Sequence, residues 1–111
     1  MENSESQRRS ERFDLTLPVT LTLVREGRRV NVTAEGRDVS KGGICLSAMQ
    51  LLHIGESFVL EFLLPYTSTP IVVRGVVRNQ SGVSYGVEFV NPTPYQAEML
   101  ERNSKVLRLL R

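Results

Sequence analysis

The sequence predicts an all-β domain, a six-stranded antiparallel β-barrel, followed by one C-terminal α-helix. Apolar and polar residues alternate in short runs, which is the pattern of half-buried strands. Segments rich in Gly, Pro, Asn and Ser separate these runs, as expected for turns. The apolar spacing changes to a helical period only near the C-terminus. Six short strands joined by tight turns favour a closed barrel, because closure removes unpaired strand edges.

The composition is that of a globular chain with one core. The 111 residues make one domain of ordinary size. No apolar run approaches the roughly 20 residues that a membrane helix needs. The segment 1–6 lacks the apolar region of a secretory signal, so we expect no membrane insertion and a cytoplasmic location. Lys and Arg outnumber Asp and Glu only 14 to 12, which does not indicate a nucleic-acid binder.

Residues 1–6 have no hydrophobic residue after Met1, and we expect them to be disordered. The predicted domain covers residues 7–111, with an arginine-rich arm at 7–12, the barrel at 13–90 and the helix at 93–110. The first strand begins at Phe13 and turns alternate residues inward, namely Leu15, Leu17, Val19, Leu21 and Leu23. Pro18 lacks an N–H, so this strand is expected to be an edge or to carry a bulge. Residues 25–28 are predicted to form a hairpin turn.

The second strand requires a change of register. Its inward residues are Val30, Val32 and Ala34. The same alternation would also bury Asp38 and Ser40, and burial of an unpaired carboxylate is costly. We therefore predict a bulge at Gly36, which brings Val39 inward and leaves Asp38 and Ser40 facing out.

Four more strands continue the alternation. Their predicted inward residues are Ile44, Leu46 and Ala48, then Phe58, Leu60, Phe62 and Leu64, then Ile71, Val73, Gly75 and Val77, and finally Val83, Tyr85, Val87 and Phe89. Residues 49–55 and 65–70 are predicted loops, and residues 79–82 a turn. Gly86 lies on the outward side, where a strand glycine often marks the close approach of other atoms.

The C-terminal helix has a clear start signal. Thr93 and Gln96 match a capping box, with Pro94 at the first helical position. An apolar stripe follows, consisting of Met99, Leu100, Val106, Leu107 and Leu110. Pairing of Glu98 with Arg102 and of Glu101 with Lys105 is expected, and the basic series Arg102, Lys105, Arg108 and Arg111 is interpreted as a solvated face. We expect the helix to pack across the mouth or side of the barrel, with its far end a candidate homodimer or partner contact.

Single occurrences of Cys and His argue against metal or redox chemistry. Cys45 cannot form an internal disulfide, and its apolar neighbours indicate a buried thiol. His53 has no second ligand at metal spacing, so a surface or loop-packing role is favoured. Without a nucleophile motif or a distinctive carboxylate pair, we expect no enzyme, no metal and no cofactor.

Two polar clusters remain that suit a nucleotide. Asp38 offers two acceptor oxygens and Ser40 a rotating hydroxyl, which match the N–H edge of guanine. The following Gly42 and Gly43 permit a tight turn and close approach by a ligand. Taken alone, the same residues also fit an ordinary hairpin turn capped by side chain to backbone bonds.

The second cluster is Arg8, Arg9 and Arg12, just before the first strand. The planar guanidinium bonds O6 and N7 of guanine, or two phosphate oxygens, at once.

In this order, Arg8-x-x-x-Arg12 and Asp38-x-Ser40-x-x-Gly43 resemble the motifs of the PilZ family of bacterial cyclic di-GMP receptors. The resemblance runs from about residue 7 to residue 90 and includes residues 86–89 as the final strand of a PilZ-like split barrel. It implies that Arg8 and Arg12 bind phosphates and guanine Hoogsteen edges, with Arg9 as a further candidate. It also implies that Asp38 and Ser40 bind the opposite guanine edge, that Gly43 allows close contact, and that cyclic di-GMP is the ligand and expected partner.

The resemblance implies a stand-alone receptor that relays the level of cyclic di-GMP to an unidentified protein effector, in bacterial motility, biofilm or exopolysaccharide control. The alternative is a PilZ-like adaptor of the type IV pilus kind, which works by protein contact without nucleotide. An RNA or DNA binder would need exposed aromatic residues, whereas the barrel aromatics are predicted to face inward. The resemblance also implies that the residue before the first arginine affects the stoichiometry of binding, and polar Gln7 at this position favours two ligands per chain over one.

Overall fold

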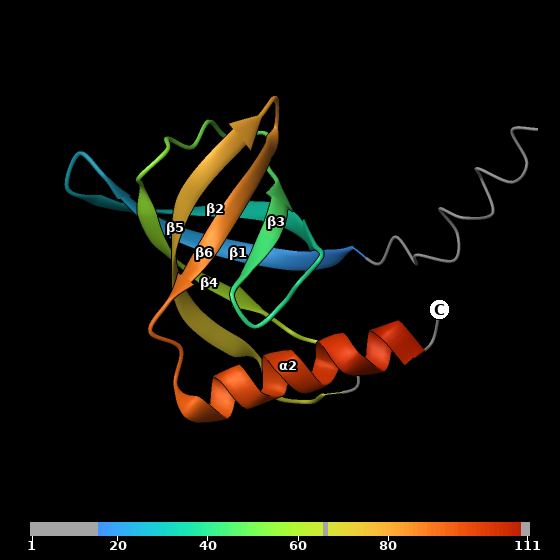
Figure 1. Cartoon of the computed structure of the whole chain (residues 1–111). Coiled ribbons are helices and arrows are strands. Elements are labelled where there is room, and N and C mark those ends of the chain that lie inside the picture. Colours follow the sequence, from blue (N-terminus) through green and yellow to red (C-terminus); the bar gives the residue numbers. More distant parts are fainter. Residues whose placement is uncertain (1–15, 66, 110–111) are drawn as a thin grey trace, which may run out of the picture.

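The computed structural model describes residues 16–65 and 67–109. Six antiparallel strands form a closed barrel in the order β1-β2-β3-β6-β5-β4, and helix α2 crosses one end of it (Figure 1). The elements are β1 (Leu17–Arg25), β2 (Arg28–Arg37), β3 (Gly43–Ser47), β4 (Ser57–Phe62), β5 (Ile71–Ser81), β6 (Ser84–Val90) and α2 (Pro94–Leu109). The predicted fold class is confirmed.

The alternating inward residues form the core that the periodicity predicts. Among the predicted positions that the structure describes, all but three are buried. Leu17 and Val30 are partly buried at the margin of the core, and Val83 is 51% exposed. Leu52, from the loop between β3 and β4, adds a further buried side chain. Burial of this apolar surface is the main force that closes the barrel.

Helix α2 closes its end of the barrel through Leu100, which is fully buried, and Met99, which packs against the core. The predicted capping box is confirmed: the Thr93 N–H donates to Gln96 Oε1 and the Gln96 N–H to Thr93 Oγ1, both at 3.1 Å. Gln96 Nε2 also donates to the carbonyl of Val72 at 2.8 Å, which ties the start of the helix to β5. Glu98 and Arg102 pair at 2.8 Å as expected.

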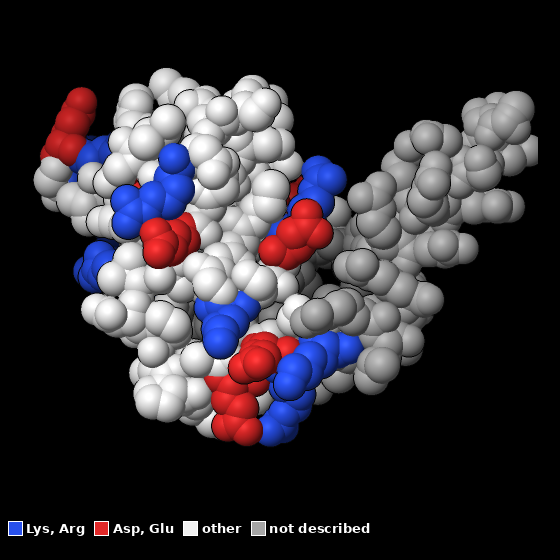
Figure 2. Space-filling model, viewed as in Figure 1, with Lys and Arg blue, Asp and Glu red and all other residues white. Residues whose placement is uncertain are grey.

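The polar side of α2 is a mixed, solvated face. Figure 2 shows acidic and basic side chains next to each other along the helix at the bottom of the view. Lys105 lies 3.8 Å from Glu101, completing the second predicted pair. The side chains of residues 106–111 lie outside the described part of the structure, so the far end of the apolar stripe and its proposed dimer contact stay predictions.

The hairpin between β1 and β2 fixes the hydrogen-bond pattern of both strands. Glu26 (φ 54°) and Gly27 (φ 75°) form a two-residue type I′ turn, at the predicted position. Such a turn makes Arg25 and Arg28 a hydrogen-bonded pair. Hydrogen-bonded and non-hydrogen-bonded pairs then alternate along the two strands.

The prediction that β1 is an edge or carries a bulge is wrong. β1 pairs with β2 along its whole length and with β4 from Val19 to Thr22, without a break in register. Pro18 faces Glu35 in a pair whose backbone groups point away from each other. Pairing with β4 begins one residue later, at Val19. No hydrogen bond between strands is therefore lost through the absence of an N–H at Pro18.

The turn predicted at residues 79–82 lies further along the chain. β5 continues to Ser81, and the turn is made by Gly82 (φ 61°) and Val83. A register irregularity between Val77 and Asn79 allows the ladder to continue, and Asn79 then faces Gly86. The predicted close approach at Gly86 is made by this neighbour, because an added Cβ would lie 2.5 Å from Asn79 Oδ1.

Candidate functional site

The motif turn, residues 38–43, joins β2 to β3 at the end of the barrel that α2 covers (Figure 1). Its first residue, Asp38, has a φ of 54°, in the left-handed region that Asp and Asn enter more readily than most residues. This conformation reverses the side-chain alternation at the end of β2. Val39 is therefore buried, while Asp38 and Ser40 are exposed, as the sequence predicts.

The predicted cause of this reversal, a bulge at Gly36, is wrong. Gly36 pairs with Leu17 of β1 and Leu46 of β3 in an uninterrupted register. Its role is to leave space inside the barrel: an added Cβ would lie 2.6 Å from Ile44 Cδ1 and 3.0 Å from Val19 Cγ2. The register change comes from Asp38 itself, after the strand has ended.

Hydrogen bonds within the turn hold it in one shape. The Ser40 N–H donates to the Gly43 carbonyl at 2.9 Å, and the Gly42 N–H donates to Ser40 Oγ at 3.2 Å. Ser40 Oγ lies 3.4 Å from the same Gly43 carbonyl. The Phe89 N–H donates to the Gly42 carbonyl at 2.9 Å, which attaches the turn to β6. These are the side chain to backbone bonds of an ordinary capped turn, and they pre-organise the segment.

The Asp38 carboxylate takes no part in this network. Among the described residues it forms no hydrogen bond and no ion pair, although it is exposed at the start of the turn. An unpaired carboxylate on a braced turn is free to accept two N–H donors of a ligand.

The two glycines of the motif differ in what they do. Gly43 opens β3, and an added Cβ would collide with the Val87 carbonyl oxygen of β6. Its lack of a side chain is thus required by strand packing. At Gly42 an added Cβ would meet no atom within 4 Å, so this position lies on the open side of the turn.

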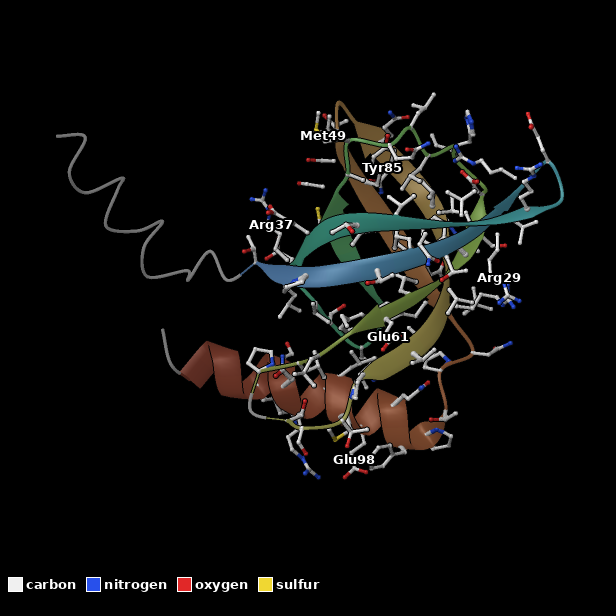
Figure 3. All side chains as sticks on the ribbon, turned by 180° about the vertical axis from the view of Figure 1, so that it is seen from behind. Arg29, Arg37, Met49, Glu61, Tyr85 and Glu98 are labelled. Atoms are coloured by element: carbon white, nitrogen blue, oxygen red, sulfur yellow. The ribbon has the colours of Figure 1, made fainter. Side chains whose placement is uncertain are left out.

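Arg37 is a cation beside the turn that the sequence analysis did not select, although it directly precedes Asp38. It is exposed at the end of β2 (Figure 3), and its Nη2 lies 3.4 Å from Ser47 Oγ. Its partner in the ladder is Cys45. Cys45 points outward and is half-buried, so the prediction of a buried thiol is wrong: its neighbours Ile44 and Leu46 take the two inward positions.

The arginine arm cannot be placed beside this turn directly, because Arg8, Arg9 and Arg12 lie outside the described residues. The position of β1 shows where the described chain enters the barrel. Leu17 pairs with Gly36, two residues before Asp38. The chain therefore enters the barrel next to the motif turn.

His53 and Glu56 belong to a structural cluster in the loop between β3 and β4. His53 is exposed, as expected, and its backbone N–H donates to Glu56 Oε1 at 3.0 Å. Glu56 also pairs with Arg25 at 2.9 Å. Burial acts to raise the pKa of Glu56, but the hydrogen bonds from Arg25 and His53 outweigh it, and the net pKa is lowered. Arg25 Nη2 donates further to the Leu51 carbonyl at 2.8 Å, which fixes the loop to the β1–β2 hairpin.

A shallow groove of about 300 Å³ lies between α2 and the loop that precedes β5. Its lining includes Thr67, Thr69, Tyr95 and Asn103. Asn103 is 5% exposed, and within the described residues neither its Nδ2 nor its Oδ1 has a hydrogen-bond partner. An unpaired buried amide is a local source of instability.

Two other features are absent from residues 16–65 and 67–109. Within these ranges no group of three or more His, Cys, Asp and Glu residues is arranged to hold a metal ion. In the same ranges no helix is long and apolar enough to cross a membrane.

Comparison with known proteins identifies the family. A family model described as the PilZ domain matches residues 6–104, which is most of the chain. No curated protein matches the chain. PilZ domains are binding and adaptor domains. With its closed six-stranded barrel, its C-terminal helix and a family match over nearly its whole length, the chain belongs to the PilZ domain family.

Proposed function

We propose that the protein is a cytoplasmic cyclic di-GMP receptor that uses the arginine arm and the motif turn as one binding site and relays nucleotide binding to a protein effector. The observation that carries this proposal is the Asp38 carboxylate, which is exposed and, within the described residues, unpaired. Asparagine or glycine would also fit the left-handed backbone of this position, so the turn by itself does not require the charge of Asp38.

The chemistry of Asp38 suits the N–H edge of guanine. Two carboxylate oxygens accept the ring N–H and the exocyclic amino group together, and hydrogen bonds to an ionised acceptor are stronger than neutral ones. The left-handed backbone of Asp38 directs the side chain outward, and the turn is already held by Ser40 and Gly43. Little conformational entropy is then lost on binding, which favours affinity.

The register of β1 supports a role for the arm. Because Leu17 pairs with Gly36, the described part of the chain begins next to the motif turn, a short distance along the sequence from the arginines. In the proposal Arg8 and Arg12 bind phosphates and guanine Hoogsteen edges, with Arg9 as a further contact. Asp38 and Ser40 take the opposite guanine edge. Gly43 keeps β3 against β6 and thereby holds the turn in place.

The second candidate is an adaptor that binds protein partners without nucleotide. One observation favours it: the Ser40 hydroxyl is already engaged within the turn, at 3.2 Å from the Gly42 nitrogen. The hydroxyl also donates to the Gly43 carbonyl at 3.4 Å, but it has two acceptor lone pairs and the Gly42 N–H uses one, so a ligand N–H can still bond to Ser40 Oγ.

Calorimetric titration with cyclic di-GMP, run beside GTP and a short oligonucleotide, separates the two candidates. The receptor binds cyclic di-GMP in preference to both controls, whereas the adaptor binds none of the three. Asp38→Asn is the most informative variant, because asparagine also tolerates the left-handed backbone and only the charge is removed. We expect this variant to lose about 1–3 kcal/mol of binding free energy with unchanged thermal stability.

The same titration measures stoichiometry. Polar Gln7 leaves room for a second stacked nucleotide, and we propose saturation at two ligands per chain. Saturation at one ligand would contradict this part of the proposal and leave the receptor function intact.

A further inference from the structure

Among the described residues, most of strand β2 has a strand neighbour on one side only. β1 pairs with β2 from Arg28 to Gly36, whereas β3 pairs with it only from Glu35 to Arg37. Among the described residues, positions 28–34 thus have no backbone partner on the β3 side. In Figure 1 this part of β2 belongs to the β1–β2 hairpin, which extends beyond the rest of the barrel.

The hairpin turn determines which backbone groups are unpaired. Since Arg25 and Arg28 form a hydrogen-bonded pair, the N–H and C=O groups of Arg29, Asn31 and Thr33 point away from β1. The next residue in this series, Glu35, pairs with Ser47 of β3, which agrees with that direction. The free edge of β2, defined as Arg29, Asn31 and Thr33, therefore presents a row of donors and acceptors at strand spacing.

The loop after β3 leaves this edge uncovered. At Ala48 the chain turns toward the β5–β6 hairpin, where the Ala48 N–H donates to the Val83 carbonyl at 3.0 Å. The core behind the gap is sealed by side chains: Leu52 is 1% exposed, and its N–H donates to the Tyr85 hydroxyl at 3.2 Å. Figure 3 shows Met49 and Tyr85 beyond the edge of β2. The barrel is thus closed without a backbone partner for the free edge.

We propose that the free edge of β2 binds an extended acidic segment of a protein partner, which adds to the barrel as a further strand. Addition of a strand to an open sheet edge is an established mode of peptide recognition, in which main-chain hydrogen bonds supply affinity. All three edge residues are exposed, and the edge contains neither a proline nor a bulge that would block pairing.

The charge of the edge indicates the sign of the partner. Arg28 and Arg29 are exposed, and in the described part of the chain neither forms an ion pair. Positions 28–34 contain no acidic residue, so in a second copy pairing through the same edge carboxylates would come only from the flanking Glu26 and Glu35. An acidic segment from another protein would neutralise both arginines.

Apolar surface next to the edge indicates the remaining side chains of the partner. The loop from Ser47, opposite Glu35, to Leu51, beside Arg25, borders the gap. Met49 in this loop is 91% exposed and Leu51 is 56% exposed. An added strand alternates its side chains, so acidic residues on its outer face would meet Arg29, and apolar residues on its inner face would meet this loop.

This surface is separate from the motif turn, and the inference does not depend on nucleotide binding. Peptides are selected from a phage-displayed library of random sequences on the full chain, and one enriched peptide is synthesised for fluorescence anisotropy. We expect enriched peptides to be acidic with alternating apolar residues. Failure to enrich any peptide, or enrichment of basic ones, would overturn the proposal.

A matched pair of variants tests whether the backbone makes the contact. Asn31→Ala keeps the edge N–H, whereas Asn31→Pro removes it without touching the β1 ladder. Pro18 in β1 is likewise at a position whose backbone groups point away from the paired strand, so this barrel already contains a proline in that kind of position. We expect Asn31→Ala to bind the peptide within about twofold of the parent and Asn31→Pro to bind at least about tenfold more weakly. Equal binding of the peptide by both variants would contradict the proposal. We expect Asn31→Pro to bind cyclic di-GMP like the parent, which separates peptide binding at the edge from the receptor function.

Hydrogen exchange on the unmodified chain gives a test that does not depend on the folding of a variant. The amides of Arg29, Asn31 and Thr33 should exchange fast in the free protein and become protected when the peptide binds. The amides of Val30 and Val32, which bond to β1, should be protected in both states. Edge amides that are already protected in the free chain, or that gain no protection with peptide, would refute strand addition.

Discussion

The two parts of β2 use the same backbone in opposite ways. At Glu35 and Gly36 the strand pairs with both β1 and β3, and Arg37, which pairs with β3, leads into the braced motif turn. From Arg28 to Ala34 it is paired only with β1 among the described residues. Next to the part that is paired on both sides, the group available for ligand binding is a side chain, the Asp38 carboxylate. Where the backbone is half-paired, its own N–H and C=O groups are available for recognition. One strand therefore serves as a rigid support at one end and as a candidate binding edge at the other.

The largest expected effect comes from disrupting the packing of β3 against β6. This packing holds the motif turn, which follows the fully paired part of β2. In Gly43→Ala the new Cβ collides with the Val87 carbonyl, so β3 must separate from β6 and the turn must move. We expect a loss of about 3 kcal/mol in the free energy of unfolding, measured by chemical denaturation, together with weaker nucleotide binding. Gly42→Ala is the matched control, since nothing lies within 4 Å of its added Cβ, and it should change stability by less than about 0.5 kcal/mol. Equal effects of the two substitutions would show that strand packing does not hold the turn.

The next effect tests whether the arm and the fully paired half form one site. Arg8→Ala and Arg12→Ala should each cost about 1–3 kcal/mol of cyclic di-GMP binding, without a change in thermal stability. Arg12→Lys should be nearly as damaging as alanine, because an ammonium group cannot form the bidentate contact of a guanidinium. If calorimetry finds that these variants bind like the parent, the arm does not belong to the site.

A smaller effect concerns α2, at the end of the barrel that carries the motif turn. Replacement of buried Asn103 by leucine removes an amide that has no partner among the described residues. We expect Asn103→Leu to match or exceed the parent by up to about 1 kcal/mol in thermal unfolding, since apolar replacement of an unpaired buried polar group is neutral or favourable. A clear loss of stability would show that this amide is satisfied in solution. Asn103→Ala provides the control for lost side-chain volume.

The smallest expected effect lies beside the half-paired end of β2, where Arg25 and Glu56 attach the β3–β4 loop to the hairpin. The pKa of Glu56 is lowered in the folded state, so its ionised form contributes stability above the pKa of the unfolded chain. That contribution is lost as the pH falls through the folded-state pKa. The stability difference between the parent and Glu56→Gln should therefore be present at neutral pH and shrink in acid. A difference that is constant from neutral to acidic pH would contradict the assignment.

The sequence by itself determined the features that depend on neighbouring residues along the chain. Period-two alternation identified the strands and their inward residues, because a strand that covers a core must bury every second side chain. Thr93, Pro94 and Gln96 located the start of α2, since a capping box is made within one turn. The outward orientation of Asp38 and Ser40 was also predictable, because burial of a carboxylate is costly.

Only the tertiary structure decided the features that depend on distant neighbours. Position 36 requires glycine because Ile44 and Val19 occupy the space of a side chain, and not because of a bulge, which no local pattern can show. Pro18 is tolerated in a strand that has neighbours on both sides at its centre because pairing with β4 starts one residue after it. The free edge of β2 exists because β3 ends at Ser47 while β2 extends to Arg28. The length of β2 that extends past the end of β3 depends on where the chain leaves β3. Sequence alternation in β2 alone does not contain this information, because it depends on how the barrel is assembled.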